Sequence, residues 1–559
     1  MTITSWHHTL FVPMVATTKK SSRRRSGQRP RRRSESTRDS NRRSALRTLR
    51  LPFILTLLLF LLIFTPRVQD SQPLLLSLFG ACAVLLAFQA LLYWQFRSRA
   101  ADAPSAQSGP VLEVMLRPQH YVQASVQASV FAYWGYYWQP VYEHIPLLIG
   151  QLLFAYVFDM LLHWSRRAKY VLGFGPFPII FSINLFLWFR DEWFYMQFVM
   201  IAAGFLGKEF IRWHREGRST HIFNPSAFTL GLFSLVLILT GTTDLTQGQN
   251  IASTLTLAPN IYTFLFLVGL IVMYLFSITL VAGMAALALF GLSALYSAST
   301  GVPYFVDAEI PAAVFLGLHL LISDPSTSPR TPVGKALFGT AYGLGVFALY
   351  RILGDVGAPT FYDKLLVVPL LNLLVPSIDR LVRGIHARTP LDIANQRQVS
   401  SRANVILMGI WAMVFIAMSA TGKTDGRHAG DSLPFWQQAC AEDRPGACAT
   451  LIRLETTYCD DNAGWACNEL GVHLREGTIT ETEPDVAQGY FSRACELRFQ
   501  AGCVNLLDDN ASARANPRPL DLQLLLREGG RNLSDMPEAA LYARACDHGW
   551  SFACTGEQP

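Results

Sequence analysis

Two short motifs place a polar residue next to a proline inside apolar sequence. Asn224-Pro225 lies in GRSTHIFNPSAFTLGL, and Asp324-Pro325 lies 100 residues later in LISDPSTSPRTPVGK. A polar residue beside a helix breaker is costly at membrane depth and typically marks a binding site or a transport path. Half-helices that begin there could hold an anionic group through free N–H groups and the helix dipole. A simpler alternative is that each proline starts a helix, with Asn or Asp as its N-cap.

Further polar side chains in and beside the apolar segments extend the candidate site. The candidate cofactor-binding residues are Asn224, Pro225, Thr254, Thr256, Asp324, Thr327 and Lys335. The candidate residues of an ion path are Asp159, Lys208, Glu209, His319 and Asn372. His319 could ligate a haem or carry a proton, or it could be a hydrogen-bonded core histidine. Asp159, Lys208 and Glu209 lie near segment ends, where they could instead reach the membrane interface.

No redox or catalytic centre can be located from the residues. The chain has neither a C-x-x-C-H motif nor the cysteine run of a ferredoxin, so neither haem attachment nor an iron–sulfur cluster is indicated. We assign no catalytic residue and expect no metal site.

Eight of the nine cysteines lie beyond residue 439, in four pairs of identical C-x₇-C spacing. The pairs are Cys440 with Cys448, Cys459 with Cys467, Cys495 with Cys503, and Cys546 with Cys554. Similar text surrounds each pair, which indicates an internal repeat of helical hairpins. If one cysteine ends a helix and the next begins the following helix, the two side chains meet and can form a disulfide. Zinc sites more often use closer spacing and histidine ligands, so we predict disulfides, and hence an oxidising compartment.

The composition is that of a membrane protein with polar appendages. Of 559 residues, 51% are hydrophobic and only 16% charged, well below the roughly 25% charge of soluble domains. Much of the net charge of +7 comes from residues 19–50, which hold two lysines and twelve arginines. That arm could bind nucleic acid or anionic lipid. We favour a cytoplasmic retention signal under the positive-inside rule and expect no nucleic-acid partner. No signal peptide is evident.

Ten apolar stretches have the length needed to cross a bilayer. They are residues 51–66, 73–95, 144–163, 171–189, 192–211, 222–241, 260–276, 278–297, 334–354 and 404–421. Segments 311–323 and 362–378 are shorter or broken, so we predict half-helices there. The polar, aromatic segment 120–142 suits an interfacial or re-entrant element. Basic clusters at Arg166/Arg167 and Arg380/Arg383 are expected in the cytoplasm, and 11 to 13 crossings remain open.

These observations predict an all-α protein with six parts. They are a disordered basic cytoplasmic arm (1–50), N-terminal transmembrane helices (51–100), an interfacial or re-entrant segment (101–142), a membrane core with an internal pseudo-repeat (143–380), a linker with the last transmembrane helix (381–432), and an extracytoplasmic α-hairpin solenoid (433–559). The predicted location is the cell inner membrane, with a cytoplasmic N-terminus and a periplasmic C-terminal domain.

Residues 140–380 resemble the RnfD/NqrB family of membrane subunits of electron transport complexes. The resemblance is carried, in order, by HIFNPSAF, DPSTSPRTPVGKALFG followed by YG, and KLLVVPLLNLLVPSID. It implies a ten-helix bundle of two related halves, partner electron transport subunits, and electron transfer coupled to ion translocation as part of an oxidoreductase complex. It also implies FMN or another flavin, attached to a threonine in a Ser-Gly-Ala-Thr motif.

This chain departs from that motif. The corresponding loop reads TGTTDLTQGQNIASTLTLAPN, in which Thr254 and Thr256 are the nearest threonines. The alternative is therefore a channel or transporter of small molecules with the same fold and no redox chemistry.

Residues 433–557 resemble the disulfide-linked SEL-like repeats, a subclass of tetratricopeptide-like solenoids. Such solenoids expose a concave surface, which predicts a protein partner outside the cytoplasm and no catalysis by this domain. A third alternative makes this array the main active part, with the membrane region as its scaffold.

Overall fold

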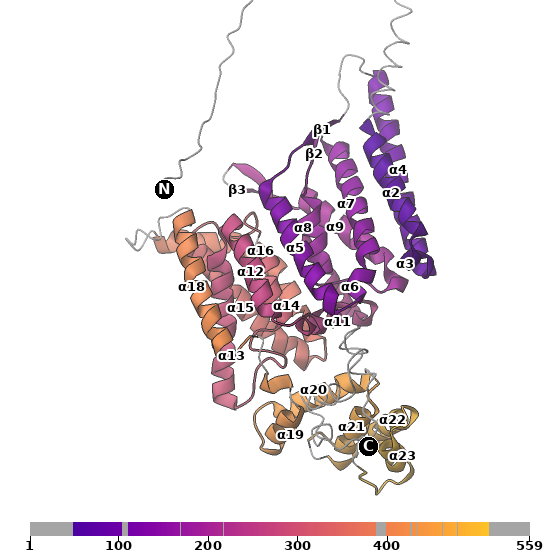
Figure 1. Ribbon diagram of the computed structural model, residues 1–559, viewed down its shortest axis with the longest axis vertical. Helices are drawn as coiled ribbons and strands as arrows, with labels where there is room; N and C mark the ends of the chain where they lie inside the picture. The colour runs from indigo at the N-terminus through magenta and orange to yellow at the C-terminus, as the bar shows by residue number, and fades with distance from the viewer. Residues whose placement is uncertain are drawn as a thin grey trace, which may run out of the picture.

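A computed structural model gives the architecture. It describes residues 48–102, 110–167, 169–215, 217–322, 324–386, 399–424, 428–431, 433–460, 462–477 and 479–513. In this part the chain is almost entirely helical, with two small two-stranded sheets. Figure 1 shows a bundle of roughly parallel helices with the strands at one end, called here the strand end. A cluster of short helices with three disulfides lies against the other end, called here the disulfide end.

An N-terminal helical pair flanks the bundle (Figure 1). Its elements are α2 (Arg50–Leu61), η1 (Leu62–Phe64), α3 (Pro66–Gln69) and α4 (Gln72–Asp102). The helices are joined by buried polar contacts as well as apolar ones, because Gln89 of α4 donates a 2.9 Å hydrogen bond to Thr56 of α2. Arg67 of α3 forms a bidentate ion pair with Asp191, both at 2.7 Å. This ion pair therefore holds the turn between α2 and α4 against Asp191, which belongs to the next group of helices.

The first half of the bundle contains four helices of 16 or more residues and two shorter α-helices. In order it comprises β1 (Val111–Val114), α5 (Pro118–Tyr137), α6 (Pro140–Glu143), α7 (Ile145–Arg166), β2 (Lys169–Leu172), α8 (Pro176–Asn184), η2 (Asp191–Trp193), α9 (Tyr195–Phe210), β3 (Arg212–Arg215), β4 (Arg218–His221) and α10 (Pro225–Thr240). Strand β1 pairs with β2 in parallel, and β3 pairs with β4 as an antiparallel hairpin.

The rest of the bundle follows along the chain. It comprises η3 (Thr243–Leu245), α11 (Gly248–Thr254), η4 (Leu255–Leu257), α12 (Ile261–Phe276), α13 (Thr279–Thr300), α14 (Ala312–Leu320), α15 (Pro332–Asp355), η5 (Thr360–Tyr362), α16 (Asp363–His386) and α18 (Ser401–Ala420). Helix α15 packs closely on α13, because a Cβ at Gly339 would lie only 2.2 Å from the Val281 carbonyl oxygen. Small residues allow helix backbones to approach in this way in membranes.

Six described helices are long and apolar enough to cross a membrane. They are Gln72–Ser98, Ile145–Arg166, Thr279–Thr300, Pro332–Asp355, Thr360–Gly384 and Ser401–Ala420. Gly248–Leu257 and Ile261–Phe276 form one further span if the two, bent by 103°, are counted together. The protein is thus compatible with a multi-pass membrane protein, as its composition indicates.

Two predictions about individual segments are wrong, and a third is narrowed. Segment 171–189 is not one spanning helix, because α8 is only nine residues long and stops at the buried Asn184. Segment 362–378 is not a half-helix, because α16 runs unbroken for 24 residues through Pro369 and Pro376. Segment 120–142 forms the continuous 20-residue helix α5, which excludes the re-entrant alternative, while the interfacial alternative stays a prediction. Its polar Gln127 is buried against α8, where it donates a 2.7 Å hydrogen bond to Ser182.

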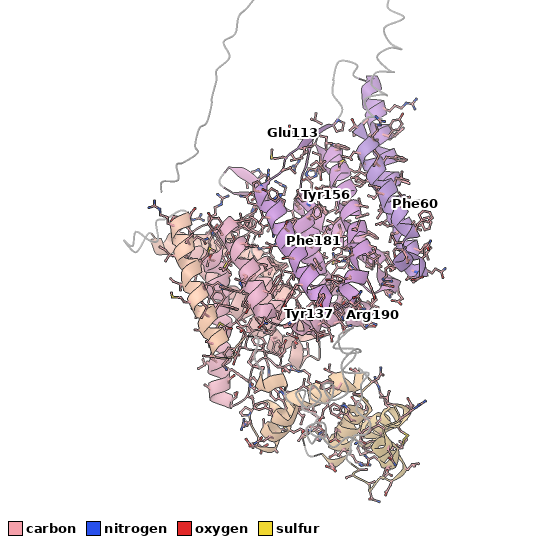
Figure 2. The ribbon with its side chains drawn as sticks, viewed as in Figure 1. Phe60, Glu113, Tyr137, Tyr156, Phe181 and Arg190 are labelled. Carbon is pink, nitrogen blue, oxygen red and sulfur yellow. A yellow bond between two sulfur atoms is a disulfide. The ribbon has the colours of Figure 1, made fainter. Side chains whose placement is uncertain are left out.

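Helices α8 and α14 are each nine residues long, and they run in opposite directions. Helix α8 begins after β2 at the strand end, and the chain beyond it reaches Arg190 at the other end (Figure 2). Helix α14 begins after loop 301–311, which contacts the disulfide-end domain, and the chain beyond it reaches β4 at the strand end. The prediction of a half-helix at 311–323 agrees with α14.

The disulfide-end domain is built from helical hairpins. Its helices are η6 (Ala429–Asp431), α19 (Leu433–Ala441), α20 (Ala447–Asp460), α21 (Gly464–Glu476), α22 (Pro484–Glu496) and α23 (Gln500–Leu507). The bridges Cys440–Cys448, Cys459–Cys467 and Cys495–Cys503 confirm three predicted pairs. Each bridge joins the end of one helix to the start of the next, as the spacing predicts.

The fourth predicted bridge, from Cys546 to Cys554, is not among these three. Cys546 and Cys554 both lie outside the described residues, which end at residue 513. The pairing of Cys554 with Cys546 is therefore neither confirmed nor contradicted and stays a prediction. The prediction of a basic arm is also untested, since residues 1–47 lie outside the described part of the chain.

Candidate functional site

A buried cluster of polar side chains lies where α8 ends. We call His144, Gln151, Asn184 and Gln197 the amide cluster; they come from α7, α8, α9 and the residue before α7. His144 Nε2 lies 3.0 Å from Asn184 Oδ1, and Asn184 Nδ2 donates to Gln151 Oε1 at 2.7 Å. Gln197 Nε2 donates to the same Gln151 oxygen at 3.2 Å. Buried polar groups are costly unless paired, and these four side chains largely pair with one another.

Backbone groups fix the orientation of these amides. The Asn184 amide nitrogen donates to the Ile180 carbonyl, so the other terminal atom of Asn184 is the oxygen that faces His144. The Phe189 N–H donates to Gln197 Oε1, which orients the Gln197 amide in the same way. Since residues 185–190 are not helical, these side chains supply partners for backbone that has left the helix.

A second polar cluster lies where the chain leaves α14. We call His221, Asn224, Asp324, Thr327 and Asn372 the Asn–Asp cluster. Asn224 Nδ2 donates to the Leu321 carbonyl at 2.9 Å, and the Asn224 N–H donates to Asn372 Oδ1 at 3.1 Å. Asn372 Nδ2 in turn donates to the Thr327 carbonyl at 3.1 Å. One asparagine of α16 therefore links the start of α10 to the non-helical chain after α14.

The Asn–Pro and Asp–Pro motifs thus meet in space. His221 Nε2 lies 3.4 Å from Asp324 Oδ2, which adds a contact between β4 and the second motif. Asn224 also accepts from the Ser226 N–H, with Pro225 at the first helical position, so it is the N-cap of α10 as the simpler alternative holds. The start of α10 meets the carbonyl end of α14. The N-terminus of α10 therefore contacts protein backbone at the place where the sequence predicts an anionic group.

Other predicted cofactor residues lie elsewhere. Thr254 and Thr256 belong to α11 and η4, which follow the far end of α10, and each hydroxyl donates to a nearby carbonyl of its own segment. Lys335 is buried at the start of α15, where its Nζ donates to the Ser277 carbonyl at 2.6 Å. The structure therefore brings Asn224, Asp324 and Thr327 together. It leaves Thr254 and Thr256 apart from them.

The predicted ion-path residues form no continuous path. Asp159 pairs with His163 at 3.2 Å, and Glu209 makes two 2.8 Å contacts with Arg167. Lys208 Nζ lies 5.4 Å from the centre of the Phe205 ring. Of the five predicted residues, Asn372 alone lies in the Asn–Asp cluster.

His319 is fully buried within α14. Its Nδ1 bonds to the Phe315 carbonyl at 2.8 Å, while Nε2 has no hydrogen-bond partner among the described residues. The ring packs against Gly269, where an added Cβ would lie 2.2 Å from His319 Cδ2. One ring nitrogen therefore behaves as in a core histidine, and the other is buried without a hydrogen-bond partner among the described residues.

Among the described residues, no group of three or more His, Cys, Asp or Glu side chains could hold a metal ion. Flavin attachment also lacks support from the loop that should provide it. Thr254 is buried, both hydroxyls are engaged by backbone, and residues 241–260 contain Asp244 but no lysine or arginine to neutralise a phosphate. The residues present do not fit a phosphoester-linked FMN, and we derive no step through one.

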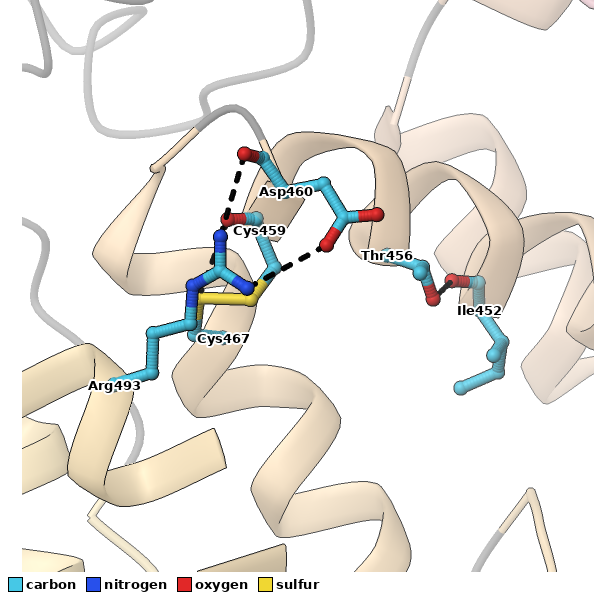
Figure 3. Close-up of a disulfide and its surroundings, with 6 residues drawn as sticks. All are labelled: Ile452, Thr456, Cys459, Asp460, Cys467 and Arg493. Atoms are coloured by element: carbon cyan, nitrogen blue, oxygen red, sulfur yellow. Dashed lines mark hydrogen bonds and ion pairs between the residues drawn. A yellow bond between two sulfur atoms is a disulfide. The ribbon is translucent and has the colours of Figure 1, made fainter. Parts of the chain in front are cut away.

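The disulfide-end domain contacts the membrane region at the loop that leads into α14. Arg444, between Cys440 and Cys448, donates to the Gly301 carbonyl at 2.9 Å. Lys423, just after α18, pairs with the buried Glu309 at 2.7 Å. Within the domain, Arg493 lies 3.6 Å from the Asp460 carboxylate beside the Cys459–Cys467 bridge (Figure 3). The hairpins are thus bridged internally and anchored to the bundle.

The amide cluster is absent from the sequence-based predictions. A usable signal exists, because Gln151, Asn184 and Gln197 each place one amide within three successive apolar segments. Asn184 lacks a neighbouring proline, which is the feature that pointed to the other cluster.

Comparison with known proteins adds no assignment: no family model, curated protein or solved structure matches this chain.

Proposed function

We propose that this chain is the ion-translocating membrane subunit of an electron transport complex of the Rnf or Nqr kind. The observation that carries the proposal is the pair of oppositely directed short helices, α8 and α14, each ending in a buried polar cluster. Broken helices at corresponding positions of two inverted halves are a recurrent device of transporters. The sequence resemblance supplies the electron transport part of the proposal.

The order of elements supports an inverted pseudo-repeat. Helices α7, α8, α9 and α10 would correspond to α13, α14, α15 and α16. Helix α7 runs toward the strand end and α13 toward the disulfide end, so the two sets have opposite directions. With α5 and α12 added to their respective halves, the arrangement gives the ten helices expected from the resemblance.

The transported species that suits this arrangement is a cation. Both short helices present their C-terminal, partially negative ends to the interior. The clusters add amide and carbonyl oxygens, which are suitable ligands for small hard cations. In this proposal Asn184 and Asn372 hold the two breaks open, and the non-helical stretches line the route. The buried His319 lies on α14 beside it.

The proposed orientation follows from charge and cysteine chemistry. Arg166, Arg167 and Lys169 lie at the strand end, which the positive-inside rule assigns to the cytoplasm. The three bridged hairpins lie at the other end, which must then be the oxidising, periplasmic side of the inner membrane. A partner protein on the repeat array completes the proposal.

The second candidate function is a channel or transporter without redox chemistry. It is favoured by the threonine loop, whose hydroxyls and charge do not suit a covalent flavin. Purified chain in proteoliposomes tests both candidates by flux of Na⁺ or H⁺ measured with fluorescent dyes. Flux that requires co-purified redox subunits and an electron donor supports the first function. Flux by the chain alone supports the second, and no flux in either setting overturns the translocation proposal.

A further inference from the structure

A lateral cavity lies beside the amide cluster. It has a volume of about 200 Å³ and is formed by α5, α6, α7 and α8. Its walls are almost entirely apolar and include Phe131, Phe181, Trp188 and Leu148. Phe181, labelled in Figure 2, comes from the short helix α8. The cavity therefore touches the element whose break the proposed transport route requires.

The mouth of the cavity faces outward from the bundle. Ala128 and Ala132 of α5 and Ile145 of α7 line it, and all three are exposed on the bundle surface. Two small alanines leave space between α5 and α7 that larger side chains would fill. In a membrane this opening faces lipid, so a ligand would arrive from the bilayer and must itself be largely apolar.

His144 provides one hydrogen-bonding atom to this apolar space. The residue lines the cavity and is 7% exposed. Its Nε2 lies 3.0 Å from the Asn184 oxygen, which can only accept, and 3.3 Å from the Gln151 amide nitrogen, which donates to the same Asn184 oxygen at 3.0 Å. The shorter contact therefore assigns the proton to Nε2. The neutral ring then has a lone pair on Nδ1, an acceptor for which the described residues provide no donor. A charged ring is disfavoured because burial without an anionic partner is costly.

Size and chemistry together define the ligand. A dry protein cavity of roughly 150 Å³ accepts benzene, so about 200 Å³ accommodates a substituted single ring. The aromatic walls suit a flat ring, and the Nδ1 lone pair suits a hydroxyl donor. We propose that this cavity binds a small, uncharged monocyclic phenol from the membrane, with its hydroxyl donating to His144 Nδ1. This site rests on the proposed membrane placement of the bundle, and its Trp188 wall belongs to the non-helical stretch beside the proposed ion route, but binding of a phenol is measured without any ion flux.

Binding can be measured with 4-fluorophenol by ¹⁹F NMR, using the full chain in lipid nanodiscs against empty nanodiscs. 4-Fluorotoluene has a similar shape but no donor, and it tests the hydrogen bond. One neutral hydrogen bond corresponds to about 2- to 13-fold in affinity, so 4-fluorophenol should bind tighter by that factor.

Three variants complete the experiment. Ala128→Phe fills the mouth of the cavity and leaves the four side chains of the amide cluster unaltered. It should abolish binding of both probes. Ala87→Phe makes the same change at an exposed position of α4 and should leave binding intact. His144→Phe should lower the affinity for 4-fluorophenol to that for 4-fluorotoluene. Equal binding of both probes by the unaltered chain, or binding that survives Ala128→Phe, would overturn the proposal and leave the groove to lipid acyl chains.

Discussion

Replacing Asn372 with leucine tests whether the two proline motifs form one structural unit. The substitution removes the acceptor for the Asn224 N–H and the donor to the Thr327 carbonyl, both now at 3.1 Å. Asn224 is 9% exposed and Thr327 2%, so neither orphaned backbone group can reach solvent without local opening. The change should therefore destabilise the junction of α10, α14 and α16.

The expected loss of unfolding free energy lies between the values known for soluble cores and for membranes. In soluble cores an orphaned buried group costs about 1–3 kcal/mol, which for two groups gives about 2–6 kcal/mol. Side-chain hydrogen bonds in membranes average only about 0.6 kcal/mol each, because the unfolded chain also finds partners there. The orphaned groups belong to non-helical or helix-starting backbone, which has few alternatives, so we expect about 2–4 kcal/mol.

The measurement is unfolding of the purified protein in mixed micelles by increasing SDS fraction, followed by tryptophan fluorescence. Asn250→Leu is the matched control, since Asn250 is exposed and its side chain bonds to the neighbouring Gln247 side chain, while its backbone contacts would remain. That control should change the unfolding free energy by less than about 0.5 kcal/mol. If Asn372→Leu behaves like the control, Asn372 does not join the two motifs, and the shared cluster is refuted.

Three further changes have defined outcomes. Gly339→Ala should destabilise the bundle by about 2 kcal/mol in SDS unfolding, because the new methyl would meet the Val281 backbone; Gly283→Ala, with open space around it, should be neutral or mildly stabilising. Replacing Cys459 and Cys467 with serine should cost about 2–3 kcal/mol, the entropy of a short closed loop, seen as faster proteolysis of the repeat domain. Lys423→Met should cost about 1 kcal/mol or less by thermal unfolding, because the lysine is half exposed although Glu309 is buried.

Sequence periodicity predicts the repeat hairpins well because the signal is covalent and repeated. A C-x₇-C pair leaves little freedom in the position of the intervening turn, and the same solution recurs at Cys440, Cys459 and Cys495. The same spacing separates Cys546 from Cys554, but these two cysteines lie outside the described residues, so the fourth bridge has only this sequence argument. In each hairpin the deciding information lies within a few residues.

The Asn–Pro and Asp–Pro motifs are similarly informative. A proline next to a polar residue interrupts apolar sequence locally, and both interruptions fall where the structure has a polar cluster. The sequence does not reveal which partners the two motifs find, because Asn372 lies more than 40 residues beyond Asp324 on another helix.

The break after α8 has no such local signal. Segment 171–189 is apolar over the length of a span, and its middle contains neither proline nor charge. The helix stops at Asn184 because Gln151, Gln197 and His144, from α7, α9 and the turn before α7, offer partners for its side chain and for the following backbone. Segment 362–378 shows the converse. Pro369 packs against Gly231 of α10, and neighbouring helices keep α16 continuous despite its prolines.

The two short helices are therefore held by different means, which has a consequence for any motion of the bundle. Helix α8 is restrained at its interior end by the amide cluster, whereas α14 is also restrained at its entrance. Loop 301–311, which leads into α14, is bonded to Arg444 of the disulfide-end domain and to Lys423 just after α18. Arg444 sits in the turn closed by Cys440–Cys448, so this bridge stiffens the contact. Displacing the disulfide-end domain would thus remove the Arg444 contact and loosen the entrance to α14, without breaking the contacts of the amide cluster that hold α8. In the proposed transporter that makes the two half-routes separately controllable.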